Sequence, residues 1–334
     1  MKILYLGNKL SQHGINTTTV ETLGATLTQS GFEVFSFSSK KNPFLRILDM
    51  LLGMLKHRDA AYVLIDTYST SAFWFAFFSS QLGRLFRIKY IPILHGGNLP
   101  HRLVSHPFLC KLLFNHAYVN VSPSAYLKFH FEQFGLSNVI CIPNSINLSE
   151  YPFQERLSFG PKLLWVRAFA EIYHPKMAID VLCLLQKKYP TASLTMVGPD
   201  KDGSLETTKK YASHFDLDVT FTGKLSKSAW TTLAKHSDVF INTTHFDNTP
   251  VSVLEAMALG LPVVSTNVGG LSYLITHEKT GFLVPDSDAV AMTHAIEKAL
   301  HFPEQTVKIV AAAKNMVLKM DWKVVENQWF QLLK

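Results

Sequence analysis

Two acidic residues stand eight positions apart in the stretch DNTPVSVLEAMALGLPVVS, residues 247–265, which is otherwise mostly apolar. They are Asp247 and Glu255, and a Thr-Pro pair lies between them. Because an unpaired buried charge is unfavourable, carboxylates in such surroundings are expected to have partners. Carboxylate oxygens accept hydrogen bonds, so the hydroxyl groups of a bound ligand are suitable partners.

The letters around this pair predict a strand, a loop, a helix and a second strand. Thr249 is the expected N-cap of the helix, Pro250 suits the first helical position, and Gly260 suits the end of the helix. We therefore expect a helix over residues 250–259. Its amino end should attract an anion through free backbone N–H groups and the helix dipole.

Glu255 would lie about 7.5 Å along the helix axis from that amino end, and helical side chains lean toward the amino end. Asp247 precedes the helix, so two acceptors would flank an anion site. A nucleotide sugar, with its diphosphate between sugar hydroxyls and ribose hydroxyls, has the matching layout. Two other interpretations stay open: Glu255 could simply reach solvent, and Asp247 could be an ordinary loop or capping residue.

Short apolar or β-branched runs alternate with helix-length segments along the whole chain, which is typical of parallel sheets covered by helices. Strands are expected at residues 2–7, 32–38, 61–67, 89–96, 117–123, 138–144, 162–167, 192–198, 218–223, 238–244 and 261–267. The pattern predicts the α/β class, with two Rossmann-like, doubly wound domains.

Polar residues, proline and glycine interrupt this pattern at residues 144–161, where we expect the domain boundary. The prediction is one domain over residues 1–155, a second over residues 156–318, and a C-terminal helix over residues 319–334 that crosses back to the first domain. Ligands of open α/β sheets bind beyond the carboxyl ends of the strands. The expected site is therefore a cleft that both domains face.

The composition favours a folded protein in a reducing compartment. Of 334 residues, 47% are hydrophobic and 17% are charged, which argues against disorder. Cys110, Cys141 and Cys183 show no paired spacing, so neither a zinc site nor a disulfide framework is indicated. The first residue leads directly into a strand-like run, and no apolar run approaches the roughly 20 residues of a spanning helix. We expect a cytoplasmic protein.

The net charge of +7 comes mainly from the first half of the chain. Residues 1–150 hold 13 Lys+Arg against 7 Asp+Glu, whereas residues 151–334 hold 19 against 18. No nucleic-acid signature is present, so an anionic membrane or an acidic acceptor is favoured over nucleic acid. Residues 43–58 form an apolar helix pattern with Arg46, Lys56 and Arg58, which could lie on a membrane surface or pack on a sheet with its basic end in water.

The stretch DNTPVSVLEAMALGLPVVSTNVGGLSYLI resembles the signature region of family 4 retaining glycosyltransferases. That family has two Rossmann-like domains in the GT-B arrangement, facing a cleft. It shows two glutamates separated by seven residues, the second followed by Ala-Met-Ala-x-Gly-x-Pro-Val-Val. Glu255 matches the second glutamate, Asp247 replaces the first, and Pro250 stands where a glycine is usual.

The resemblance implies roles for these positions. Glu255 would hold the ribose of the donor nucleotide, and Asp247 would hold the donor sugar together with Thr249, Val251 and Ser252. The first domain would bind the acceptor, and the second would bind the nucleotide sugar.

Two basic residues could neutralise a diphosphate leaving group. Arg167 ends the strand KLLWVR, and Lys176 lies near the start of the next helix; they resemble the Arg and Lys phosphate clamp of the family, with a longer spacing. Lys176 could equally be a solvated helix residue. Gly198, in the loop VGPDKDG, is expected to line the nucleotide base.

The first domain offers two further candidates. His95 lies at a strand end before Gly96 and Gly97, where the backbone allows close approach of a ligand. It resembles the first-domain histidine that the family places near the reacting sugar. Gly14 looks like the glycine loop of the family beneath the donor phosphate.

The resulting expectation is a retaining, metal-independent hexosyltransferase. It would need no cofactor and would use a UDP-, GDP- or ADP-sugar as donor. His95, Arg167, Lys176 and Asp247 are the candidate catalytic residues. The acceptor would be a glycan or a lipid-linked glycan in cell-envelope polysaccharide or glycolipid synthesis, with peripheral association at the inner, anionic face of the membrane.

Four alternatives are kept. A single-domain, metal-dependent transferase would use the acidic pairs at residues 200–202, 216–218 or 286–288. A GT-B nucleotide-sugar epimerase would consume donor without an acceptor. A Rossmann dehydrogenase is disfavoured because no complete G-x-G-x-x-G follows the first strand. A non-catalytic nucleotide-sugar binding protein is the fourth alternative, because Asp247 departs from the family pattern.

Overall fold

The computed structural model describes residues 1–13, 18–95, 97–215 and 217–334, and within these residues the strands form two separate six-stranded sheets. All strand pairs within both sheets are parallel. The chain divides into two compact units. One comprises Met1–Pro143 together with Trp329–Lys334, and the other comprises Asn144–Gln328.

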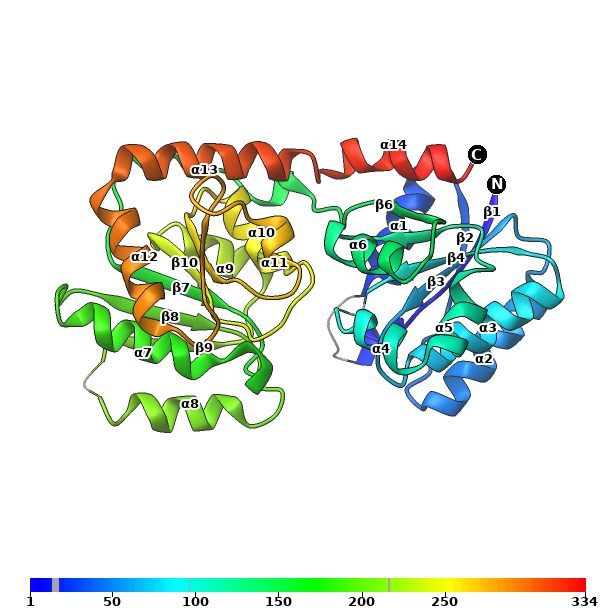
Figure 1. Cartoon of the computed structure of the whole chain (residues 1–334), viewed down its shortest axis with the longest axis horizontal. Coiled ribbons are helices and arrows are strands. Elements are labelled where there is room, and N and C mark those ends of the chain that lie inside the picture. Colours follow the sequence, from blue (N-terminus) through cyan, green and yellow to red (C-terminus); the bar gives the residue numbers. More distant parts are fainter. Residues whose placement is uncertain (14–17, 96, 216) are drawn as a thin grey trace. The chain divides into compact units, whose positions relative to one another are not determined.

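The first unit holds the sheet with the strand order β2-β1-β3-β4-β5-β6 (Figure 1). Its strands are β1 (Lys2–Leu6), β2 (Glu33–Phe37), β3 (Tyr62–Thr67), β4 (Lys89–Leu94), β5 (Asn120–Ser122) and β6 (Val139–Cys141). Its helices are η1 (Ser11–His13), α1 (Thr19–Gln29), α2 (Pro43–Lys56), α3 (Phe73–Leu85), α4 (Leu99–Ser105), α5 (Pro107–Phe114) and α6 (Ala125–Gln133).

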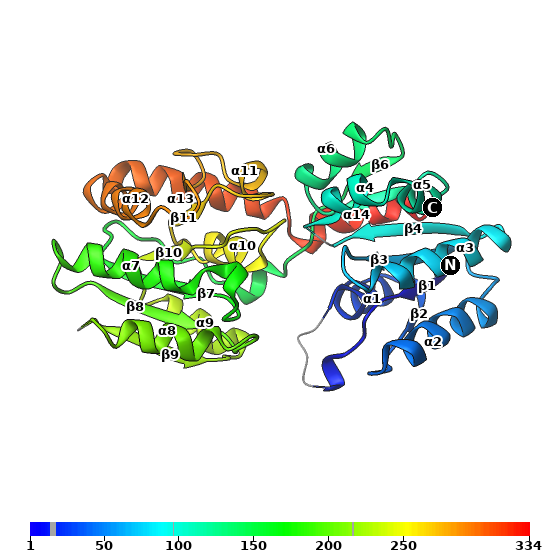
Figure 2. The ribbon, with the colours of Figure 1, turned by 60° about the horizontal axis from the view of Figure 1, so that its bottom comes forward.

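One large core in the first unit joins the sheet to the helices α2 to α6. Every residue of β3 is buried, as expected for a central parallel strand covered on both faces. Met54 of α2, Phe73 of α3 and Phe114 of α5 pack in this core. Figure 2 shows α2 beside α3, and the two helices are in contact.

The end of the chain is part of the first unit. Trp329 and Leu333 are buried, and the Tyr62 hydroxyl donates a hydrogen bond of 3.1 Å to the Lys334 carbonyl. Trp329 belongs to helix α14 (Trp322–Leu332), and Leu333 and Lys334 follow it. The chain therefore enters the second unit after Pro143 and returns to the first before Trp329.

The second unit holds the sheet with the strand order β12-β11-β10-β7-β8-β9. Its strands are β7 (Lys162–Val166), β8 (Ser193–Val197), β9 (Val219–Gly223), β10 (Val239–Asn242), β11 (Val263–Thr266) and β12 (Phe282–Val284). Its helices are η2 (Leu148–Glu150), η3 (Glu171–Tyr173), α7 (Pro175–Gln186), α8 (Ser204–Ala212), α9 (Lys227–Ala234), α10 (Val251–Ala258), α11 (Leu271–Leu274), α12 (Ala289–His301) and α13 (Pro303–Leu318).

Two cores cover the two faces of this second sheet. Helices α7 and α12 contribute Ile179 and Ile296 to one core, and helices α9 and α10 contribute Trp230 and Met257 to the other. The expected α/β class with two doubly wound halves is confirmed. Strand β12, three residues long, was not expected, because a run this short gives little periodicity to detect.

The helices were also searched for membrane spans. Among the residues that the structure describes, no helix combines the length and the apolar character needed to cross a bilayer.

Candidate functional site

Helix α10 presents its amino end beyond the carboxyl edge of the second sheet. It runs from Val251 to Ala258, and Pro250 is its N-cap residue with an extended ψ of 118°. Pro250 has no side-chain group that could cap the helix, and the expectation that Thr249 is the N-cap is wrong. The chain makes its turn into the helix at the proline itself, whose ring fixes φ near the helical value.

Ser252 lies in the first turn of α10, where backbone N–H groups have no intrahelical acceptor. Its side chain is buried, and the Oγ atom finds no hydrogen-bond partner in the described part of the chain. Val251 beside it is 43% exposed. A buried hydroxyl without a partner is unfavourable, so this helix end is chemically suited to a ligand with acceptor oxygens.

A pair of glycines holds the loop in front of α10. The Gly270 N–H donates to the Asp247 carbonyl at 2.9 Å. A Cβ atom on Gly269 would lie 2.1 Å from the Asp247 carbonyl oxygen, and one on Gly270 would lie 1.9 Å from that of Asn248. Only glycine permits this approach. Sequence analysis did not assign these two residues a role, although an adjacent glycine pair after a strand is a signal of close backbone contact.

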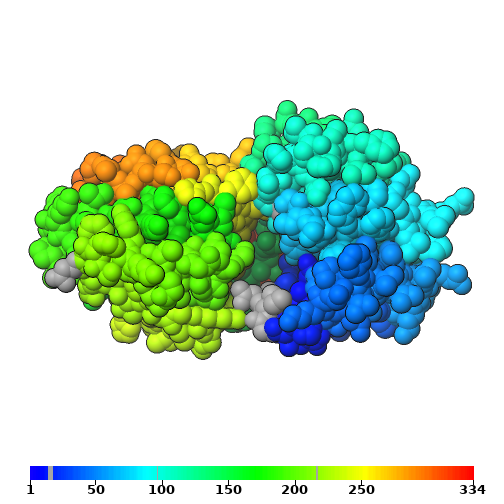
Figure 3. All heavy atoms as spheres, turned by 90° about the horizontal axis from the view of Figure 1, so that it is seen from below, coloured from blue at the N-terminus to red at the C-terminus, as the bar shows by residue number. Residues whose placement is uncertain are grey.

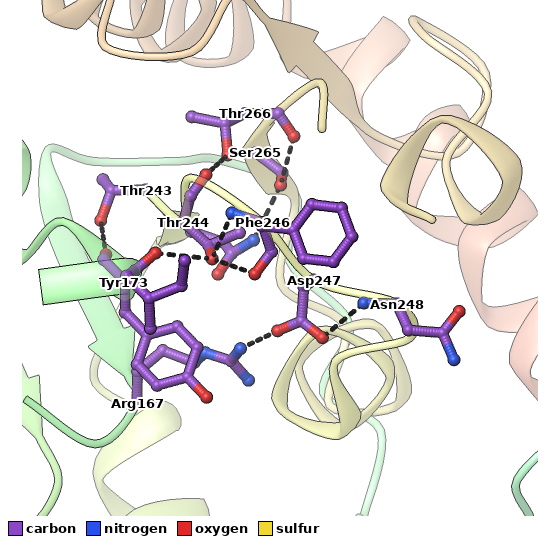
Figure 4. A network of polar contacts seen from close by, with 11 residues as sticks. Arg167, Tyr173, Thr243, Thr244, Phe246, Asp247, Asn248, Ser265 and Thr266 are labelled. Atoms are coloured by element: carbon purple, nitrogen blue, oxygen red, sulfur yellow. Dashed lines mark hydrogen bonds and ion pairs between the residues drawn. The ribbon is translucent and has the colours of Figure 1, made fainter. Parts of the chain in front are cut away.

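Arg167 and Asp247 form an ion pair in front of the helix (Figure 4). Arg167 follows β7 directly, and Asp247 lies in the loop after β10, so neighbouring strands bring them together. The guanidinium of Arg167 lies over the Tyr173 ring, 4.1 Å from its centroid. Burial lowers the pKa of Arg167, but a guanidinium stays charged at any physiological pH.

The Arg167 Nε atom is buried and has no partner among the described residues. The guanidinium therefore donates to Asp247 through one nitrogen, while its Nε–H donor has no acceptor among the described residues. An arginine held by stacking and by one carboxylate is well placed to donate a hydrogen bond to a phosphate oxygen.

Glu255 is buried, so the interpretation that its carboxylate simply reaches solvent is wrong. It is 7% exposed and accepts a hydrogen bond of 2.5 Å from the Tyr151 hydroxyl. The Lys227 ammonium lies 3.8 Å from the same carboxylate. Burial raises the pKa of Glu255, and burial together with the nearby carboxylate raises the pKa of Tyr151.

Tyr151 and Lys227 were missed in the sequence. Tyr151 belongs to the segment where the domain boundary was expected, and Lys227 is the first residue of α9. Both residues precede Glu255 in the sequence, by 104 and 28 positions, and nothing in the local pattern around Glu255 indicates either partner.

Two other expected residues of this unit have different surroundings. Lys176 is exposed in the first turn of α7, and its ammonium lies 5.9 Å from the centroid of the Tyr211 ring, near α8. Its described contacts do not include Arg167. Gly198 follows β8, and a Cβ atom there would lie 1.7 Å from the Arg167 carbonyl oxygen, so this glycine makes room for the backbone that carries Arg167.

In the first unit, His95 is paired with a buried aspartate. Its Nε2 lies 2.8 Å from Asp66 Oδ1, which also accepts a hydrogen bond from the Tyr5 hydroxyl at 2.9 Å. The side chain of His95 is 7% exposed and that of Asp66 is fully buried. Sequence analysis missed Asp66 and Tyr5. Gly14 lies outside the described residues.

The acidic pair at residues 200–202, considered for a metal-dependent transferase, accepts hydrogen bonds from backbone N–H groups. Asp200 accepts from the N–H groups of Gly203 and Leu205, and Asp202 accepts from those of Glu171 and Ser204. The single-domain alternative is wrong because the described strands form two sheets.

Two Rossmann-like units in one chain define the GT-B class of glycosyltransferase fold. Sucrose-phosphate synthase from Thermosynechococcus elongatus is similar over 99% of this chain and 98% of its own, with a TM-score of 0.81 and 16% identity. Anabaena HepE, solved in complex with UDP-glucose, is similar over 100% of this chain and 99% of its own, with a TM-score of 0.77 and 17% identity.

Residues 150–316, half of the chain, match the family described as glycosyl transferases group 1, and the protein belongs to this family. Glycogen synthase from Mycobacterium tuberculosis is 27% identical over 204 residues, which cover 59% of this chain and 49% of the relative. The chain thus spans about half the length of the curated relatives it matches. Membership of the family disfavours a dehydrogenase. The narrower assignment to family 4 stays a prediction.

Proposed function

We propose that the protein transfers a sugar from a nucleoside diphosphate sugar to an acceptor hydroxyl, with retention of configuration. One observation carries the proposal: the Ser252 hydroxyl, without a partner among the described residues, lies in the first turn of α10, after the loop in which Asp247 pairs with Arg167 and three residues before the buried Glu255. An anion flanked by hydroxyl groups suits this arrangement.

The proposal assigns a role to each second-unit residue. Arg167 stabilises the departing diphosphate, assisted by the N–H groups of the first turn of α10. Glu255 accepts hydrogen bonds from the ribose. Asp247, with Thr249, Val251 and Ser252, binds the donor sugar.

The Arg167–Asp247 ion pair fits these roles without a large rearrangement. Asp247 orients the guanidinium while its other oxygen accepts from the Asn248 N–H at 2.7 Å. Each member of the ion pair would bind a different part of the donor. Asp247 would accept a hydrogen bond from a sugar hydroxyl, and Arg167 would donate one to a phosphate oxygen. Asp247 stands where the family has a glutamate, and its shorter side chain reaches Arg167 in this structure.

His95 orients the transferred group rather than attacking it. Its contact with Asp66 fixes the orientation of the ring. Gly14 and Lys176 complete the proposed set at the phosphates, and Gly198 is proposed to line the base.

We propose that the transfer needs neither a metal nor another cofactor, because Arg167 and the helix end supply positive charge at the diphosphate. Activity of protein treated with a chelator should equal that of untreated protein when both are assayed well below the unfolding temperature. A transfer reaction that required added Mg²⁺ or Mn²⁺ would contradict this part of the proposal.

The acceptor is proposed to be a glycan, free or lipid-linked, at the inner face of a membrane. The supporting observation is a stripe of large apolar side chains exposed on α2: Phe44, Leu45, Leu48, Leu52 and Leu55, each at least 48% exposed. At 3.6 residues per turn they fall within an arc of about 100°. An apolar stripe of this kind is uncommon on a surface that faces only water.

The surroundings of the stripe are basic. Lys40, Lys41, Lys56 and Arg58 are exposed beside it, although Arg46, expected on the basic face, is buried and donates to the Lys40 and Lys41 carbonyls. Figure 3 shows α2 and α3 side by side at the surface of the first unit. The combination suits anionic lipid headgroups and the boundary of the acyl chains. The other face of α2 packs on the sheet through Met50 and Met54.

The experiment that tests the transferase is a panel of UDP-, GDP- and ADP-sugars, screened for thermal stabilisation and then for transfer to an added glycan acceptor. UDP-glucose is the first donor to try. One donor class should stabilise the protein, and acceptor should be required for release of the nucleotide. Release of nucleotide or change of the donor sugar without acceptor would favour the epimerase, and donor binding without any turnover would favour the binding protein.

A further inference from the structure

Three loops at one edge of the second sheet bring two histidines and an aspartate together. His174 follows η3 after β7, His245 lies in the loop after β10, and Asp286 follows β12. The rings of His174 and His245 are stacked with their centroids 4.2 Å apart. The Nδ1 atom of His245 lies 2.9 Å and 3.0 Å from the two carboxylate oxygens of Asp286.

Each of the three side chains offers one ligand atom within 4.8 Å of the other two. In a tetrahedral zinc site, ligand atoms about 2.0–2.2 Å from the ion lie roughly 3.5 Å from one another. Asp286 is exposed and already contacts His245, so small side-chain movements would close the remaining gap. Such a cluster, with three groups able to bind one ion, is well suited to a cation.

His174 supplies an independent indication. Its Nδ1 atom is buried and has no partner among the residues that the structure describes. The residue also adopts a left-handed backbone, with φ of 47°, which is uncommon for a side chain other than glycine, asparagine or aspartate. The fold thus holds an imidazole nitrogen in an unfavourable position, and a metal ion would provide the missing partner.

The loops that carry these ligands are joined by hydrogen bonds. The His245 N–H donates to the Ile172 carbonyl at 2.9 Å, and the Thr243 hydroxyl donates to the Tyr173 carbonyl at 2.9 Å (Figure 4). The Thr244 hydroxyl adds a bond of 3.2 Å to Ile172. The histidines are therefore positioned by the backbone before any ion binds, which favours binding.

We propose that His174, His245 and Asp286 bind a divalent transition-metal ion of the zinc class. Two imidazoles and one carboxylate suit Zn²⁺, Co²⁺ or Ni²⁺ and leave a position for water. They do not suit Mg²⁺, which prefers oxygen ligands and retains its own water.

The site is distinct from the diphosphate chemistry and does not depend on the proposed function. Its effect would be on the stability of the loops and not on transfer well below the unfolding temperature: Tyr173, next to His174, stacks on Arg167, and His245 is two residues from Asp247. The bound ion would brace the loops that hold this ion pair.

The test is calorimetric titration of untagged, chelator-stripped protein with Zn²⁺, and separately with Co²⁺ and Mg²⁺. We expect one Zn²⁺ or Co²⁺ per chain and no Mg²⁺. At a free Zn²⁺ concentration about 100 times the Kd, the unfolding temperature should rise by roughly 5 °C or more. Absence of saturable Zn²⁺ binding overturns the proposal.

Two variants locate the ion. Asp286→Asn keeps the size of an exposed side chain, and His174→Asn places a residue that tolerates the left-handed backbone. Each should weaken Zn²⁺ binding at least tenfold while the circular dichroism spectrum stays unchanged. His236→Ala, at an exposed histidine of the same unit, is the matched control and should leave the Kd unchanged. Binding that survives both site variants, or that Cys141→Ser or His236→Ala abolishes, would place the ion elsewhere and overturn the assignment.

Discussion

At the scale of single residues, Glu255 is the side chain whose environment is most informative. It is a buried carboxylate with two partners, Tyr151 and Lys227, and it lies in a helix that begins at a proposed phosphate site. A buried carboxylate that has a hydroxyl donor and a cation beside it can accept further hydrogen bonds from a ligand. Its properties can be tested without knowing the acceptor.

Replacement of Glu255 by alanine should weaken donor nucleotide binding about 10- to 100-fold, because hydrogen bonds to a charged group contribute about 1.5–3 kcal/mol. The measurement is calorimetric titration with the nucleoside diphosphate that the panel identifies. Glu155→Ala, at an exposed glutamate of the same unit, is the control and should bind normally. Equal affinities for the two variants would exclude Glu255 from the ribose site.

Donor binding should also depend on pH through Glu255. Because burial raises the pKa of Glu255, affinity should fall with decreasing pH at a higher pH than for an ordinary glutamate. Tyr151→Phe removes a hydrogen bond that lowers this pKa, so the fall should move to still higher pH. Titrations at a series of pH values between about 4.5 and 8 measure the shift, starting from the ordinary pKa. An unchanged pH profile in Tyr151→Phe would contradict the prediction.

The raised pKa of Glu255 affects stability in the opposite direction to donor affinity. A raised folded pKa means that the native state holds the Glu255 proton more tightly than the unfolded chain does. The contribution of Glu255 to the free energy of unfolding is therefore fully present below the ordinary glutamate pKa. It decreases as pH rises from that value to the raised value. Stability and donor affinity should thus change in opposite directions over this window.

At the scale of elements, the loop before α10 depends on the glycine pair before α11. Gly270 has a φ of −79°, which any residue can adopt, so the contact with Asn248 alone requires glycine. Gly270→Ala should displace the loop that carries Asp247 and lower kcat/KM by at least tenfold, since small displacements of binding groups are costly in rate. Gly24→Ala, where a Cβ atom meets nothing closer than 3.3 Å, is the control. Normal kinetics in Gly270→Ala would show that the loop position is unimportant.

The elements also show what the sequence could predict. Helix α10 was expected within one residue at each end, because its apolar run and Gly260 are local signals. Its cap was not, because local rules favour Thr249 and the choice of Pro250 depends on how the preceding loop lies against Asp247 and the glycine pair. Tyr151 lies 104 residues from Glu255, and the Arg167–Asp247 pair spans 80 residues. Contacts between residues so far apart depend on the order of the strands in the sheet, and that order cannot be read from the local pattern of one sequence.

At the scale of the whole molecule, the exposed stripe on α2 should control membrane association. Vesicles of phosphatidylcholine with phosphatidylglycerol should bind the protein, and those of phosphatidylcholine alone should bind it weakly. The double variant Leu48→Asp/Leu52→Asp changes exposed residues, so folding should be preserved. It should reduce vesicle binding at least tenfold, because each buried leucine contributes about 1.5–3 kcal/mol.

The control for this experiment is Val290→Asp, at a position of α12 that is 53% exposed. It should leave vesicle binding unchanged. Transfer to a small, water-soluble acceptor should be normal in the α2 variant, which separates membrane docking from catalysis. Undiminished binding of that variant to anionic vesicles would assign docking to another surface.

The return of the chain to the first unit has a consequence for synthesis on the ribosome. Domains generally fold in the order in which they emerge, but the first unit here is discontinuous: Trp329 and Leu333 complete its core, and Tyr62 bonds to Lys334. The second unit, Asn144–Gln328, emerges entirely before those residues. Residues 1–143 therefore leave the ribosome before the second unit but complete their fold after it, and they must stay soluble until residues 329–334 arrive.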